Sequence, residues 1–207
     1  MFPLKDENPS SIFPIVTWSL IMINLSIFLW EILTPLSYQQ IFYIYGFVPA
    51  NGISFGILSS MFLHGDILHI GGNMLYLYIF GDNVEDACGH ISFIFFYIIC
   101  GVGAALLLMI IEPTSTMPVV GASGAISGIL GGYALLFPTA KIRTAVLSLG
   151  FIQLIYLPAF VLIGFWFLLQ LGYAMLGIQT GVAYWAHIGG FVAGLILIRP
   201  FATRKRS

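Results

Sequence analysis

Four polar side chains stand out because strongly apolar residues surround them. Ser123 lies in GASGAISG, His187 in AHIGGFVAG, and His69 and Asn73 in HIGGN. Polar and ionisable groups are costly inside an apolar span, so they indicate function by default. A hydroxyl, an imidazole and an imidazole–amide pair are the groups that acyl transfer needs as nucleophile, general base and oxyanion donors. The sequence therefore predicts a serine–histidine hydrolytic site.

The composition of the chain indicates that membrane-embedded segments must position these groups. Of the 207 residues, 59% are hydrophobic and only 7% are charged, against roughly 25% charged in soluble domains. We therefore expect lipid to cover most of the chain. The net charge of −1 gives no electrostatic reason to expect nucleic acid as a partner. Cys88 and Cys100 lack metal-binding spacing, and we expect no metal and no cofactor.

Six apolar runs are long enough to cross a bilayer, which takes about 20 residues. They predict an all-α polytopic membrane protein, a six-helix bundle that forms one membrane-embedded domain over residues 1–207. The fifth run is too long, and Pro158 is expected to divide it into an interfacial piece and a span. The runs are Ile12–Leu33, Ser60–Phe80, His90–Ile111, Pro118–Phe137, Ala145–Leu171 and Gly181–Ile198.

The basic residues predict the orientation. Six spans put the N-terminal tail, the loop between spans four and five and the basic C-terminal tail on one side, and every lysine and arginine falls there. The positive-inside rule makes that side cytoplasmic, and we expect the membrane to be the plasma membrane. The basic tail is also a candidate for contact with anionic lipid. The seven are Lys5, Lys141, Arg143, Arg199, Arg204, Lys205 and Arg206.

The four polar residues are expected at one depth. At 1.5 Å per residue, Ser123 lies about 7–8 Å below Pro118 and His187 about 9 Å below Gly181. His69 and Asn73 are four residues apart and share a helix face. Each motif alone is explained more simply, as helix packing or as an interhelix hydrogen bond. Matched depth favours a site, because packing does not require it.

Small residues are expected to bring spans four and six together. Spacing of the small-xxx-small kind lets two helix backbones approach closely, so that the hydroxyl and the imidazole come within hydrogen-bond reach. Asn24, an isolated polar residue in span one, is interpreted as a packing contact. The small residues are Gly121, Gly124, Gly128, Gly132, Ala183, Ala186, Gly190, Ala193 and Gly194.

The motifs HGDILHIGGN, GASG and AHIGGFVAG, in this order and spacing, resemble those of the rhomboid family of intramembrane serine proteases. The resemblance covers nearly the whole chain. It implies that Ser123 attacks a peptide bond, with His187 as general base and then acid. His69, Asn73 and the Ser123 backbone N–H would form the oxyanion hole. It also implies membrane-anchored substrates cut in or beside their transmembrane segments, with span five and the loop before Gly181 as lateral gate and cap.

The chain departs from the family pattern at two places. Many members carry Trp-Arg where this chain has Phe55 and Gly56, which bears on how the first outer loop is anchored. Members often have an aromatic residue where this chain has Ser127, so His187 needs another support; Tyr133, Tyr184 and Trp185 are the candidates. With no carboxylate at mid-depth, helix packing is expected to orient the base.

Other functions stay open on the sequence. A rhomboid-like pseudoprotease that binds client helices is the main alternative, although inactive relatives typically lose the nucleophile or the base. A transporter or channel is less consistent, because no charged ring marks an ion path. Zinc and aspartyl intramembrane proteases are excluded, since the chain has no HExxH motif and no pair of membrane aspartates. The sequence does not indicate the oligomeric state.

Overall fold

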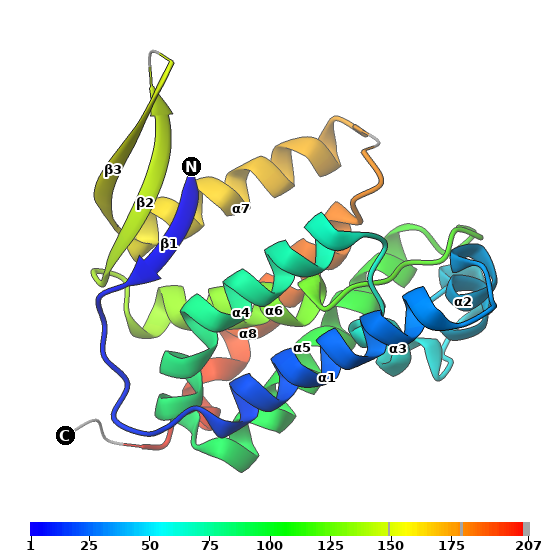
Figure 1. Cartoon of the computed structure of the whole chain (residues 1–207), viewed down its shortest axis with the longest axis horizontal. Coiled ribbons are helices and arrows are strands. Elements are labelled where there is room, and N and C mark those ends of the chain that lie inside the picture. The colour runs from blue at the N-terminus through cyan, green and yellow to red at the C-terminus, as the bar shows by residue number, and fades with distance from the viewer. Residues whose placement is uncertain (149, 179, 205–207) are drawn as a thin grey trace.

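The computed structural model describes residues 1–148, 150–178 and 180–204. Within them the chain forms eight α-helices, two short 3₁₀ turns (Pro49–Asn51 and Ser60–Phe62) and three strands (Figure 1). The helices are α1 (Ile15–Leu33), α2 (Tyr38–Tyr45), α3 (Gly56–Ser59), α4 (Ile67–Cys88), α5 (His90–Ile111), α6 (Ser123–Leu136), α7 (Ala159–Met175) and α8 (Tyr184–Phe201). The strands are β1 (Phe2–Asp6), β2 (Lys141–Ser148) and β3 (Phe151–Pro158).

Each of the six apolar runs overlaps one helix, namely α1, α4, α5, α6, α7 or α8. The third run, His90–Ile111, coincides with α5. By length and composition, α1, α5 and α8 are the helices of the described chain that are long and apolar enough to cross a membrane. Helices α6 and α7 are apolar but shorter, and α4 ends in a polar segment. The count of six spans therefore stays a prediction.

The described chain is mostly helical, as predicted, but it also contains a small sheet that the all-α expectation did not include. Strands β1, β2 and β3 form an antiparallel sheet in that order, at the end of the bundle where α6 ends and α7 begins (Figure 1). Residues 145–148 and 151–158, assigned to span five, belong instead to strands β2 and β3. The run is rich in β-branched and aromatic residues, which favour strands, and Gly150 adopts a left-handed φ of 83° beside the hairpin turn. Pro158 does divide the run, and α7 begins directly after it.

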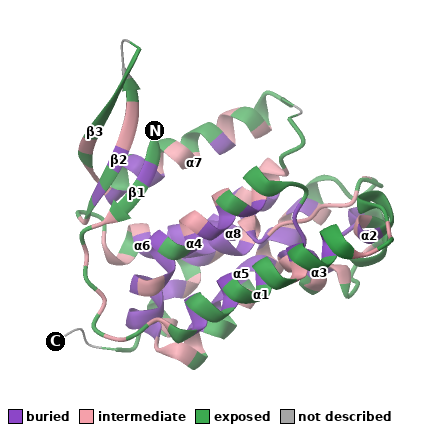
Figure 2. Ribbon diagram, in the orientation of Figure 1, coloured by how far each residue is buried: buried purple, intermediate pink, exposed green. Residues whose placement is uncertain are grey.

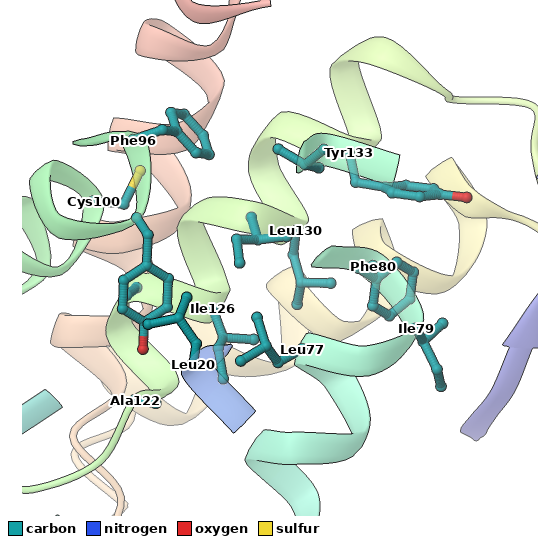
Figure 3. Close-up of a cluster of buried hydrophobic side chains, with 14 of the residues drawn as sticks. Leu20, Leu77, Ile79, Phe80, Phe96, Cys100, Ala122, Ile126, Leu130 and Tyr133 are labelled. Carbon is teal, nitrogen blue, oxygen red and sulfur yellow. The ribbon is translucent and has the colours of Figure 1, made fainter. Parts of the chain in front are cut away.

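The core lies around α6. Buried residues concentrate on α6 and on the faces of α4, α5 and α8 that surround it, whereas most of β3 is exposed and most of α7 is exposed or half-buried (Figure 2). Figure 3 shows Leu77 and Phe80 of α4 facing Ile126, Leu130 and Tyr133 of α6. The helix that begins at Ser123 is therefore held from several sides.

Glycines set the distance between α6 and α8. A Cβ at Gly190 would meet the carbonyl oxygen of Gly124, and one at Gly194 would meet that of Gly128. The backbones are thus in direct contact, as the small-xxx-small spacing predicts. A methyl group at either position would push apart the two helices that carry Ser123 and His187.

A distant carboxylate caps α1. Pro14 precedes the helix and supplies no side-chain cap. The Glu85 side chain, near the end of α4, accepts the backbone N–H groups of Val16 at 2.9 Å and Thr17 at 2.7 Å, and also the Thr17 hydroxyl. It bonds the His90 ring as well. Because helix N-termini leave N–H groups unpaired and favour negative charge, Glu85 fixes α1 against α4.

We expect Glu85→Ala to destabilise the fold by about 2 kcal/mol, because it leaves buried N–H groups without an acceptor. The measurement is the midpoint of unfolding in a detergent titration. Glu112→Ala is the matched control, since Glu112 is an exposed glutamate beyond α5. Equal midpoints for the two variants would contradict the capping role.

Candidate functional site

Three helices begin at one place. His69, Ser123 and His187 lie in the first turns of α4, α6 and α8, and Asn73 lies one turn deeper in α4. The sequence-based depths assumed helix from Pro118 and from Gly181, which is wrong because α6 starts at Ser123 and α8 at Tyr184. All four side chains nevertheless line one cavity, and Ser123 and His187 are in contact there.

Ser123 and His187 are hydrogen-bonded. The Ser123 Oγ lies 2.8 Å from the His187 Nε2, and both residues are half-buried. The His187 Nδ1 lies 2.9 Å from the Gln170 Oε1, on α7. An amide oxygen only accepts, so Nδ1 carries the ring proton and Nε2 presents its lone pair to the serine hydroxyl. This tautomer is the one that a general base requires.

The His187 ring is supported from α7. The Trp166 ring lies 6.1 Å away between centroids, tilted by 32°, and Trp166 is one helical turn before Gln170. Two of the expected supports bond elsewhere: the Tyr133 hydroxyl donates to Asp6, and the Tyr184 hydroxyl bonds Thr180. Ser127, in the position of the expected aromatic, donates to the Ser123 carbonyl at 2.6 Å. A side-chain hydrogen bond and an indole therefore orient the imidazole, where helix packing was expected to do so.

Asn73 has a free donor. Its side chain is buried, and its Nδ2 finds no hydrogen-bond partner among the described residues. A buried donor without a partner is costly, and this one belongs to a residue that lines the cavity beside Ser123. The packing interpretation of Asn73 required a bond to a neighbouring helix, and the described chain provides none for this amide nitrogen.

His69 offers a second donor. Asp66 caps α4 by accepting the N–H groups of Leu68 and His69, each at 2.8 Å. The His69 Nδ1 accepts the Gly65 N–H at 3.2 Å, so Nε2 carries the proton. That nitrogen faces Gly121, where a Cβ would come within 2.7 Å of it and where φ is 125°. Glycine is thus required beside the ring.

His64 packs behind His69. The two rings are 5.1 Å apart between centroids, edge to face, and the His64 backbone N–H is held by the Glu31 carboxylate of α1. His64 is fully buried. The buried His64 ring therefore supports His69 by packing against it.

The start of α6 supplies backbone donors. Ser123 is the first residue of the helix and follows Ala122, which has no side-chain oxygen to act as a cap. The first N–H groups of a helix have no partner within it, and they carry the positive end of the helix dipole. The Ser123 N–H, the Asn73 amide and the His69 imidazole are thus three hydrogen-bond donors belonging to residues that line the cavity.

The site opens into a cavity of about 1130 Å³. Its walls include the four polar side chains, Trp166 of α7 and, from the first loop, Phe42, Phe47 and Ile57. No cluster of side chains suited to a metal ion occurs in the described residues.

A family model described as the rhomboid domain matches residues 51–204, more than half of the chain. The chain belongs to the rhomboid family. Among curated relatives of this rhomboid, RHOMBOID-like protein 4 of Arabidopsis thaliana is 34% identical over 149 residues, covering 70% of this chain and 34% of that protein. RHOMBOID-like protein 2 of the same plant is 34% identical over 149 residues, covering 70% and 43%.

A more distant match is Rhomboid protein 1, mitochondrial, of Saccharomyces cerevisiae, 34% identical over 90 residues, or 42% of this chain and 26% of that protein. This rhomboid therefore spans less than half the length of the three relatives named here. The comparisons establish the family.

The departure at Phe55 and Gly56 has a structural explanation. Phe55 is exposed, and a Cβ at Gly56 would meet the Gly46 carbonyl. The Ser59 hydroxyl donates to the Tyr45 carbonyl at 2.6 Å. In this rhomboid the first loop is thus held by close backbone contact, which an arginine at position 56 would prevent.

Gln170 and Trp166 were missed in the sequence. Neither is ionisable, and both lie in a continuous apolar run, where a search for charged groups passes over them. The available signal is that Gln170 is a polar residue within that run, one helical turn after Trp166.

Proposed function

We propose that this rhomboid is an intramembrane serine endopeptidase, with Ser123 as nucleophile and His187 as general base. The observation that carries the proposal is the 2.8 Å bond from the Ser123 Oγ to the His187 Nε2, in a histidine whose other nitrogen donates to Gln170. Nucleophile, base and orienting group in series are the arrangement that activates a serine hydroxyl.

The mechanism follows from the geometry. As the Ser123 Oγ attacks the scissile carbonyl carbon, its proton passes to the His187 Nε2. The carbonyl oxygen becomes an oxyanion that accepts from the Ser123 N–H, the Asn73 Nδ2 and the His69 Nε2. When the tetrahedral intermediate collapses, His187 donates its proton to the leaving amine. Water then attacks the acyl carbonyl and gives a proton to His187. The ester bond to the Ser123 Oγ breaks, His187 returns the proton to that oxygen, and the new carboxylic acid leaves.

The substrates we propose are membrane-anchored proteins cut in or near a transmembrane segment. The support is the placement of the site in the first turns of two apolar helices, one of which, α8, is long and apolar enough to cross a membrane. The test is incubation of the purified chain with a transmembrane substrate in detergent, together with labelling by a fluorophosphonate serine probe. Client binding without cleavage or labelling would favour the pseudoprotease instead.

We propose that both termini are cytoplasmic, in the plasma membrane. Lys5 pairs with Arg143 in the sheet, and the Arg204 N–H bonds the Ala87 carbonyl. Lys141 begins β2, five residues after α6 ends, and Arg199 lies in the last turn of α8, so both are at the opposite ends of these helices from Ser123 and His187. The five described basic residues thus gather at the end away from the site, which supports the positive-inside assignment. Lys205 and Arg206 lie outside the described residues.

For topology, we expect a reporter fused after Ser207 to report the cytoplasm, and one fused after Met117, between α5 and α6, to report the opposite side. The pair controls for expression. A reporter that works only in the cytoplasm should be active after Ser207 and silent after Met117, and a reporter that works only outside should show the reverse. An external C-terminus would overturn the orientation and place the site on the cytoplasmic side.

A further inference from the structure

Helix α7 buries one polar side chain. Its buried residues are Ala159, Leu162, Ile163 and Gln170, and the rest of the helix is half-buried or exposed. Gln170 is therefore the one buried residue in the second half of α7. An amide in an apolar setting costs free energy unless it is hydrogen-bonded, so its position next to the His187 Nδ1 calls for an explanation.

The contact controls the tautomer of the base. Neutral histidine carries its proton on either nitrogen, and only the Nδ1–H form leaves Nε2 free to take the Ser123 proton. The Gln170 Oε1, 2.9 Å from Nδ1, stabilises that form and fixes the ring plane. Without this acceptor, the Nε2–H form gains population, and it cannot act as base toward Ser123.

An amide suits this depth better than a carboxylate. In soluble serine proteases a buried aspartate accepts the Nδ1 proton and also stabilises the imidazolium. A charge within a membrane segment is costly. An amide oxygen accepts the Nδ1 proton as a carboxylate would, but it carries no net charge. Trp166, on the same face of α7, holds the same ring.

The geometry points to Gln170 as the positioning residue of the site, a neutral third member that completes a Ser123–His187–Gln170 series. This inference rests on the proposed function and extends it. The contact exists only while α7 lies against α8. The position of α7 therefore affects which nitrogen of His187 carries the proton.

The experiment compares five purified forms: wild type, Ser123→Ala, Gln170→Met, Gln170→Glu and Gln153→Met. Methionine keeps the length of glutamine but has no strong acceptor, whereas glutamate keeps the Oε1 acceptor whether or not it is ionised. Gln153→Met is the matched control, because Gln153 is exposed on β3. For each form kcat, KM, the rate of fluorophosphonate labelling and the unfolding midpoint are measured.

We expect Gln170→Met to lower kcat and the labelling rate about tenfold, the size expected for one hydrogen bond, with KM and the midpoint nearly unchanged. Gln170→Glu should recover most of the loss, and Gln153→Met should match the wild type. Three results would overturn this inference but not the proposed function: a wild-type kcat in Gln170→Met, no recovery in Gln170→Glu, or a loss of kcat that follows the unfolding midpoint. An inactive, unlabelled wild type would overturn the proposed function and this inference with it.

Discussion

Ser123→Ala is expected to abolish both cleavage of a transmembrane substrate and fluorophosphonate labelling. In a serine–histidine mechanism, removal of the nucleophile costs a factor on the order of 10⁶ in kcat, which puts turnover below detection. The fold should be retained, because the substitution removes one hydroxyl from a half-buried residue and alanine is a better helix former than serine. The unfolding midpoint checks this.

Ser19→Ala provides the matched control for that experiment. Ser19 is an exposed serine on α1 whose Oγ donates to the Ile15 carbonyl at 2.7 Å, far from the cavity. Its replacement should leave cleavage, labelling and the midpoint unchanged. Proteolysis by purified Ser123→Ala at more than a trace of the wild-type rate would remove Ser123 as the nucleophile.

The helices could be predicted to the extent that apolar runs end in polar or glycine-rich residues. The bounds of α5 follow directly, because Gly89 and Glu112 flank an unbroken apolar run. The start of α6 was missed since Pro118 to Ala122 is as apolar as the helix itself. In the structure that segment is not helical and is held by the bridge between Phe47 and Val119, a long-range contact that no local pattern reports.

The sheet was missed because hydrophobicity alone does not separate a strand from a span. Residues 151–157, FIQLIYL, read equally well as the start of a membrane helix, and the pairing of β2 with β1 joins residues more than 130 positions apart. Pro158 was the useful local signal, since proline removes a backbone donor and restricts the residue before it.

The candidate site was more predictable than the fold around it. Ser123, His187, His69 and Asn73 are polar groups whose cost in an apolar run makes them visible, and the glycines that let α6 meet α8 are visible too. What orients His187 depends on how α7 packs on α8. That packing brings Gln170 to the imidazole from 17 residues away, and spacing alone does not predict it.

Asn73→Ala is expected to lower kcat by about 100-fold or more, roughly 3 kcal/mol, if its amide donates to the developing oxyanion. KM should move little, because the donor acts mainly when charge develops. The physical basis is the buried Asn73 Nδ2, which has no partner in the described chain and lines the cavity with Ser123. Since no hydrogen bond of this nitrogen is lost on substitution, the unfolding midpoint should stay near the wild-type value.

Asn24→Ala is the matched control for Asn73→Ala, because Asn24 is also a buried asparagine in an apolar helix, but its Nδ2 donates to the Leu20 carbonyl at 2.7 Å. We expect that variant to keep its kcat and to lose about 0.6 kcal/mol of stability, the usual value of a membrane hydrogen bond. The two asparagines should thus show opposite patterns on the same two measurements. If Asn73→Ala instead lowers the midpoint and keeps near-normal turnover, Asn73 is a packing residue. The oxyanion would then depend on the Ser123 N–H and the His69 imidazole alone.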